Sequence, residues 1–271
     1  MWRDRASATG TGPVIRRIMA TGMTHRGARR RANEDMLAIA GWSGNADMEG
    51  PEQRLLSLRA PFACAVADGL GGHEGGALAS SIVIARLMRE AMRLQDAEAV
   101  ADLVASLEAD LARLAGERGF AAAPGSTLAA LIARGEGRPM LAVNIGDSRI
   151  YRISARGVER LSTDDTSATG GEAEDTDDRT GLAGHALVQA IGGGHAPKRL
   201  TPHVVEVPLR ADERYFLCTD GVTDVMGNSE IHALSLRHHD DDKAFCAAVF
   251  SECMARGGPD NITLCLLRPL H

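Results

Sequence analysis

Short apolar runs that end in an aspartate recur along the chain and predict β-strands with an acidic residue at the end. The run 62–67 stops at Asp68, the run 215–219 stops at Asp220, and a glycine follows each aspartate. A strand holds its side chains in defined directions, and the glycine lets the backbone turn sharply with its carbonyl exposed. Each position therefore places oxygen atoms where a hard cation could bind them.

Two further aspartates occupy the same kind of position. Asp147 lies in a turn between two apolar runs, and Asp260 precedes another strand-like run. An Asp-Gly pair alone is equally compatible with an ordinary turn. The phrase 30–35, in which Glu34 and Asp35 follow basic residues, favours a site that holds both metal and phosphate.

The spacing of the other apolar residues separates helices from strands. Helical spacing predicts amphipathic helices over 77–94 and 96–115, and the acids at 240–242 indicate the start of a further helix over 245–254. Apolar runs predict strands within 14–24, 30–40, 128–134 and 141–152. Because strands outnumber helices and follow one another as hairpins, we expect an α+β fold of antiparallel sheets with helices outside them.

Three segments lack a clear strand pattern. The composition of residues 41–59 predicts an irregular surface segment between strands. The acidic segment 164–178 has too few apolar side chains to contribute much to a core. We interpret 164–178 as a mobile flap that favours basic substrates, with an inert solvated loop as the alternative. Residues 184–191 predict a short helix that ends at the glycines 192–194.

Length and composition narrow the class of protein. A chain of 271 residues without a disordered linker predicts a single domain over 14–271, behind a flexible tail over 1–13. The net charge of −6 argues against a nucleic-acid partner. No apolar stretch reaches the roughly 18 residues of a membrane span, so we expect a soluble cytoplasmic protein. Five scattered cysteines predict reduced core thiols.

The stretches that carry chemistry follow one another in a definite order between residues 21 and 267. They are 30–35, 68–73, 125–127, 146–149, 161–164, 190–192, 220–224 and 260–263. This series resembles the metal-dependent Ser/Thr protein phosphatases of the 2C type, in their bacterial-like form. The resemblance implies a four-layer α-β-β-α sandwich, with two central antiparallel sheets flanked by helix pairs. It also implies hydrolysis of phosphoserine and phosphothreonine in proteins through a metal-activated water.

By the same resemblance, the site would hold two Mn²⁺ or Mg²⁺ ions with oxygen ligands. Asp68 would bridge the two ions, and Asp220 and Asp260 would complete one of them. The carbonyl of Gly69 and, through water, Glu34 would serve the other ion. An all-oxygen ligand set favours these hard cations over zinc.

Supporting roles follow from the resemblance as well. Asp147, together with Asp220, would hold a third, looser ion. Asp35, Asp224 and Asn261 would support the ligands from behind.

Arg30 stands where the family grips the substrate phosphate, and a guanidinium can bind two phosphate oxygens at once. The residues alone do not choose between it and the neighbouring arginines at 26, 29 and 31. With the resemblance, Arg30, Asp68 and Asp220 become the predicted catalytic residues.

Two positions depart from the family pattern. Leu70 stands where some relatives carry a histidine that protonates the leaving alcohol, so the general acid is unassigned and a metal-held water is the working choice. His73, three residues later, is interpreted as structural. Asp165 stands where the family often has a histidine, near the start of the predicted flap.

Two other functions compete with the phosphatase interpretation. A catalytically inactive phosphoprotein-binding member of the same fold would have lost metal ligands, whereas every expected ligand is present here. A metal-dependent phosphodiesterase would use the same two-metal chemistry, but the acidic charge and few aromatic residues disfavour a nucleic-acid substrate. We expect phosphorylated proteins from a Ser/Thr kinase pathway as substrates, no nucleic-acid or membrane partner, and a monomer.

Overall fold

A computed structural model describes residues 15–72, 74–120, 123–167, 186–194 and 200–270. Its strands are β1 (Arg17–His25), β2 (Met36–Ile39), β3 (Trp42–Gly44), β4 (Glu52–Ser57), β5 (Phe62–Ala67), β6 (Gly69–Leu70), β7 (Gly125–Ser126), β8 (Leu128–Ala133), β9 (Met140–Ile145), β10 (Arg149–Ser154), β11 (Gly157–Arg160), β12 (Ile191–Gly192), β13 (His203–Val207), β14 (Arg214–Cys218) and β15 (Ile262–Leu270). Its helices are α1 (Glu74–Glu90), η1 (Ala91–Arg93), α2 (Ala97–Arg118), α3 (Asp220–Thr223), α4 (Asn228–Arg237) and α5 (Asp242–Ala255).

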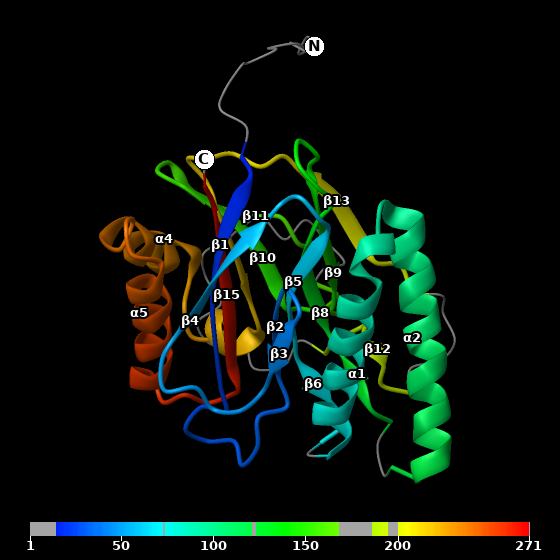
Figure 1. The fold of residues 1–271 in the computed structure, drawn as a ribbon. Helices are drawn as coiled ribbons and strands as arrows, with labels where there is room; N and C mark the ends of the chain where they lie inside the picture. Colours follow the sequence, from blue (N-terminus) through cyan, green and yellow to red (C-terminus); the bar gives the residue numbers. More distant parts are fainter. Residues whose placement is uncertain (1–14, 73, 121–122, 168–185, 195–199, 271) are drawn as a thin grey trace, which may run out of the picture.

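The strands form two large antiparallel sheets and a small one. One six-stranded sheet has the order β11-β10-β14-β15-β1-β4, and the other has the order β13-β9-β8-β5-β2-β3. The small sheet, β12-β7-β6, lies next to α1 and α2. Figure 1 shows the helix pair α1 and α2 on one side of the sheets and the pair α4 and α5 on the other. The predicted four-layer α-β-β-α sandwich is confirmed.

Strand alternation explains why the sandwich has three apolar interfaces. In β2, Met36 and Ala38 belong to the core shared with α1 and α2, whereas Leu37 and Ile39 belong to the core between the sheets. Successive strand residues point to opposite faces, so one short strand can contribute to two cores. A third core joins the β10–β14–β15 face to α4 and α5. Both large sheets are thus buried on both faces, so the ends of their central strands hold fixed positions.

The helices predicted from apolar spacing are confirmed, with clear capping signals. Helix α2 begins after Asp96, whose carboxylate accepts the backbone N–H of Ala99 at 2.9 Å. It ends at Gly119, which has the left-handed φ of 61° that glycine adopts easily. Helix α5 begins in the same way, after Asp241, whose carboxylate accepts the N–H of Ala244 at 3.0 Å.

Two expectations for irregular segments are wrong. Residues 41–59 contain β3 and β4, and β4 pairs with β1 from Gly22 opposite Glu52 to Arg17 opposite Ser57. Most residues of this edge strand are exposed, so its sequence lacks apolar alternation. The described part of 184–191 is not helical: Leu187 forms an isolated bridge and Ile191 begins β12. The predicted tail lies outside the described residues.

The cysteines behave as the sequence predicts. Their thiols are all free and buried: Cys64, Cys218, Cys246, Cys253 and Cys265. Burial raises the pKa of the Cys218 thiol above its ordinary value, which removes any nucleophilic character at neutral pH. Separately, every helix among the described residues is too short or too polar to cross a lipid bilayer.

Candidate active site

The four strand-end aspartates meet at one end of the two sheets. Asp68 follows β5, Asp220 follows β14, Asp147 lies between β9 and β10, and Asp260 lies just before β15. Burial raises the pKa of Asp68 well above its usual range, and the charge of Asp220 raises it further. Burial likewise raises the pKa of Asp220, and the charges of Asp147 and Asp260 raise it further. Carboxylates that perturb one another in this way form one electrostatic cluster.

Glycines allow the backbone to approach this cluster closely. A Cβ on Gly69 would lie 2.3 Å from the carbonyl oxygen of Gly76 and 2.6 Å from that of Glu34. A Cβ on Gly76 would lie 2.1 Å from Oε2 of Glu34. The Glu34 carboxylate therefore lies against the first turns of α1, where the helix dipole favours a negative charge. Neither glycine position has room for a side chain.

Asp35 is the most deeply buried acid of the cluster, at 1% exposed. Its Oδ2 accepts a hydrogen bond from the Thr219 hydroxyl at 2.8 Å, whereas its Oδ1 has no partner. Burial raises the pKa of Asp35 to about 7, although hydrogen bonds from Thr263 and Thr219 oppose this shift. The cluster therefore contains one fully buried carboxyl group with an unpaired oxygen.

Asn261 joins the loop that carries Glu34 to the Asp260 loop. Its Oδ1 accepts the backbone N–H of Glu34 at 2.8 Å, and its Nδ2 donates to the carbonyls of Arg26 and Ala32 at 3.1 and 3.0 Å. These contacts span more than 220 positions of sequence. The side chain therefore positions a predicted ligand without touching the predicted metal site.

The hydroxyl groups of Thr127 and Ser148, which lie next to Asp68, were not predicted from the sequence. Thr127 accepts the backbone N–H of Asp68 through Oγ1 at 2.9 Å and donates its own N–H to the Asp68 carbonyl at 2.9 Å. The Thr127 hydroxyl also bonds that of Ser148 at 2.7 Å, which links Asp68 to the turn that carries Asp147. The signal was present, because both hydroxyls lie in stretches that carry the family resemblance.

Among the neighbouring arginines, Arg30 reaches the cluster. Its Nη2 lies 2.5 Å from Oδ2 of Asp260, and half of its side chain is exposed. Partial burial opposes its charge, but the attraction of Asp260 and of two further cluster carboxylates outweighs this and raises the pKa of Arg30. Arg26, by contrast, pairs with Asp47, with Nε 3.2 Å from Oδ2. The structure thus distinguishes Arg30 from Arg26 as the candidate phosphate-binding residue, a choice that the residues alone did not make.

Asp147 faces the same cluster from the β9–β10 turn. Loss of hydration raises its pKa to about 6, and the charges of Asp164 and Asp224 add to the shift. Asp224 ends the short helix α3, and its N–H donates to the carbonyl of Asp220 at 2.8 Å. Asp224 is exposed, but it lies close enough for its charge to raise the pKa of both Asp147 and Asp220.

The donor set fits hard divalent cations. Every candidate ligand offers oxygen, several carboxylates are crowded enough to hold raised pKa values, and Oδ1 of Asp35 is buried without a partner. Within the described part of the chain, no three His, Cys, Asp or Glu side chains already form a closed set of ligands. Asp260, for example, is engaged by Arg30.

The departures from the family pattern have different outcomes. Leu70 lies in β6 and pairs with Gly125, so this position supplies no acid. His73 and residues 168–178 lie outside the described residues. Asp164, Asp165 and Thr166, the first residues of the acidic segment, are buried and are therefore not part of a solvated loop.

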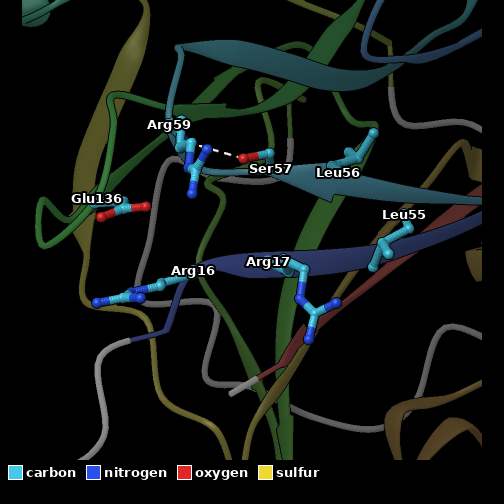
Figure 2. Close-up of a pocket in the computed structure, with 7 residues that line it drawn as sticks. All are labelled: Arg16, Arg17, Leu55, Leu56, Ser57, Arg59 and Glu136. Carbon is cyan, nitrogen blue, oxygen red and sulfur yellow. Dashed lines mark hydrogen bonds between the residues drawn. The ribbon is translucent and has the colours of Figure 1, made fainter.

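A separate pocket of about 470 Å³ lies at the other end of β1 (Figure 2). It is lined by Arg16, Arg17, Leu55, Leu56, Ser57, Arg59 and Glu136. None of the predicted site residues contributes to its wall, so the chemistry of the carboxylate cluster, and not this pocket, identifies the candidate active site.

The fold and the carboxylate cluster together define an α-β-β-α sandwich with an acidic, oxygen-rich site at the ends of its two large sheets. The family model described as protein phosphatase 2C matches residues 57–264, and the chain belongs to that family. The serine/threonine protein phosphatase PstP of Mycobacterium tuberculosis is 34% identical over 216 residues, which cover 74% of this chain but 39% of PstP. The serine/threonine phosphatase Stp of Listeria monocytogenes is 25% identical, with 74% of this chain and 82% of that protein covered.

Solved structures agree with the family assignment at the level of the fold. A PstP catalytic domain in complex with two manganese ions matches with a TM-score of 0.71 at 22% identity, covering 94% of this chain and all of that one.

Proposed function

We propose that the protein is a metal-dependent phosphatase that hydrolyses phosphoserine and phosphothreonine in proteins. The observation that carries the proposal is the cluster of Asp68, Asp147, Asp220 and Asp260 at the strand ends, with the half-exposed Arg30 at its rim. A phosphate monoester is an anion, so a site for it needs cations to offset the carboxylates. The manganese ions of the PstP catalytic domain support Mn²⁺ or Mg²⁺ in this role.

The proposed ligands follow the predicted assignment. Asp68 would bridge two cations, Asp220 and Asp260 would hold one of them, and Gly69 with Glu34 would hold the other. When bound, the two cations would neutralise the phosphoryl oxygens and lower the pKa of the attacking water. The negative charge that crowds Asp68 and Asp220 in the protein alone supplies the affinity for these cations.

Arg30 would orient the substrate phosphate. The guanidinium has five N–H donors in a rigid fork, and Asp260 engages one nitrogen of that fork. A phosphate at the rim would therefore compete with Asp260 for Arg30, while a cation would compete with Arg30 for Asp260. Both changes favour the arrangement in which the carboxylate binds the cation and the guanidinium binds the phosphate.

Asp147 would hold a third, more weakly bound cation together with Asp220. The charge of Asp147 raises the pKa of Asp220, and this proximity supports the assignment. Asp35, Asp224 and Asn261 would keep the ligands in place from behind.

The wider setting is part of the same proposal. Residues 14–271 would act as one catalytic domain and as a monomer, on phosphoproteins produced by a Ser/Thr kinase pathway in the cytoplasm. Five free, buried thiols support a reducing compartment. Light scattering on a sizing column would contradict the monomer if it gave the mass of a dimer at assay concentration.

The test compares a phosphothreonine peptide, a phosphotyrosine peptide and a phosphodiester with Mn²⁺ present and after chelation. Phosphate release from the phosphothreonine peptide that requires Mn²⁺ is the expected result. Hydrolysis of the diester alone would replace the proposal with a phosphodiesterase. Tight binding of the phosphopeptide without release would indicate the inactive, phosphoprotein-binding alternative.

A further inference from the structure

Asp165, which stands where the family often has a histidine, is the centre of a buried hydrogen-bond cluster. Its Oδ2 accepts the backbone N–H of Gly146 at 2.9 Å. Its Oδ1 accepts from Nε2 of Gln189 at 2.8 Å and lies 2.9 Å from Nε2 of His203. A carboxylate can only accept, so the His203 ring must carry its hydrogen on Nε2. Asp165 is 6% exposed, and both of its carboxylate oxygens take part in these contacts.

Asp165 forms hydrogen bonds with both backbone polar groups of Gly146. The backbone N–H of Asp165 donates to the carbonyl of Gly146 at 3.0 Å, so both polar groups of that glycine are bound. Gly146 has a φ of 95°, and a Cβ there would lie 2.7 Å from Cγ2 of Thr127. This backbone conformation is therefore available to glycine alone, and the Asp165 contacts hold it in place.

Asp147 is the next residue in the chain after this clamped glycine. The side-chain amide of Asn144 completes the turn, with bonds to the carbonyls of Gly146 and Ser148 at 3.2 and 3.1 Å. The direction of the Asp147 side chain thus depends on a backbone that Asp165 holds across 19 positions of sequence.

The partners of Asp165 come from separate elements. His203 begins β13 and pairs with Asn144 of β9, next to the turn (Figure 1). Gln189 precedes β12, and its Oε1 accepts the N–H of Thr201 at 3.1 Å. A histidine at position 165 would offer one acceptor nitrogen at most, whereas the carboxylate serves Gly146, Gln189 and His203 together. The aspartate therefore matches the donors that surround it.

We propose that Asp165, held by His203 and Gln189, is a positioning residue that orients Asp147 through Gly146 and so sets the affinity for the third cation. The inference rests on the proposed function, because it requires a cation at Asp147 and Asp220. Asp165 itself touches neither the cation nor the substrate. Its removal should weaken the third cation site selectively and leave the two sites around Asp68 unchanged.

The experiment counts Mn²⁺ ions by titration calorimetry and electron paramagnetic resonance, and measures hydrogen exchange of the Gly146 amide in the chelated protein. Loss of a charged hydrogen-bond network predicts about a ten- to hundredfold weaker third Mn²⁺ in Asp165→Ala, with the two tighter ions unaffected. Gly146 exchange should accelerate in parallel. Asp165→Asn keeps an oxygen for Gly146 but turns an NH2 group toward the donors of Gln189 and His203, so it should recover only part of the affinity, while His203→Leu should show a smaller loss than Asp165→Ala.

Asp242→Asn is the matched control, because Asp242 is equally buried and binds Arg268 at 2.7 Å in the opposite helix layer. It should lower thermal stability without changing the third Mn²⁺. The proposal would be overturned if both Asp165→Ala and His203→Leu left the third-ion affinity and the exchange of the Gly146 amide unchanged. If Asp165→Ala does not fold, the result for His203→Leu alone is the test. Two Mn²⁺ ions in the parent protein would instead refute the third-ion assignment under the proposed function, and the affinity claim with it.

Discussion

Replacement of Asp35 by asparagine should stabilise the cation-free protein at pH 8, although it removes a hydrogen-bonded carboxylate. Asp35 is 1% exposed, and one of its two oxygens has no partner. Burial raises its pKa from 3.8 to about 7. The folded protein therefore keeps a proton on Asp35 at pH values where the unfolded chain has lost it. Stability from this group is present at low pH and is lost as the pH rises through about 7.

The expected magnitude follows from that shift. A difference of about 3 pKa units, at roughly 1.4 kcal/mol each, amounts to about 4 kcal/mol of destabilisation above pH 7. The asparagine N–H at the Oδ1 position would lack an acceptor, which costs about 1 kcal/mol. The net gain is therefore about 3 kcal/mol at pH 8. At pH 5 the charge contribution falls to about 2 kcal/mol, so the net gain is about 1 kcal/mol.

Urea denaturation of parent and Asp35→Asn in chelator, at pH 5 and pH 8, measures both differences. Asp242→Asn is the control, because the carboxylate it removes is paired with Arg268, so this variant should be less stable than the parent at both pH values. An Asp35→Asn protein that is less stable than the parent at pH 8 would refute the reasoning. A gain that is the same at both pH values would show that protonation of Asp35 is not its cause.

Three further predictions concern activity. Asp220→Asn should abolish Mn²⁺-dependent phosphatase activity while the circular dichroism spectrum stays that of the parent, because it removes charge without changing volume; activity within tenfold of the parent in saturating Mn²⁺ would exclude the assignment. Arg30→Ala should lower kcat/KM for a phosphopeptide by about ten- to a hundredfold, from the loss of one charge-assisted contact, while Arg29→Ala serves as the neighbouring control. Asp147→Ala should retain two tightly bound ions yet lose turnover, with partial recovery at high Mn²⁺ through mass action; normal turnover with two ions bound would argue against a catalytic role.

Elements with strong internal periodicity could be predicted because local rules decide them. Helices α1 and α2 show apolar residues at helical spacing, α5 follows a run of acids, and β5 is an apolar run that ends at Asp68. Strand β4 could not be predicted, because its exposed side chains carry no alternation and it becomes a strand only by pairing with β1. The predicted helix near residue 187 failed for a related reason, since β12 exists only through its contact with β7.

The same distinction between local and long-range contacts applies to the residues of the candidate site. The positions of Asp68 and Asp220 follow from the strand that precedes each of them, and the ordered series of such positions is what reveals the family. The environment of Asp165 had no local signal, because its partners Gly146, Gln189 and His203 come from other segments.

The sequence by itself therefore determined the strand ends, the amphipathic helices, the family and the oxygen-rich character of the site, since each depends on residue type and short-range spacing. The tertiary structure alone showed that Arg30, which the resemblance had selected, contacts Asp260, and which hydroxyls support the carboxylates. Arg30 and Asp260 are 230 positions apart, and Thr219 and Asp35 are 184 apart. Such contacts arise only when the two sheets pack face to face and bring the ends of their central strands together, a result that no short stretch of sequence encodes.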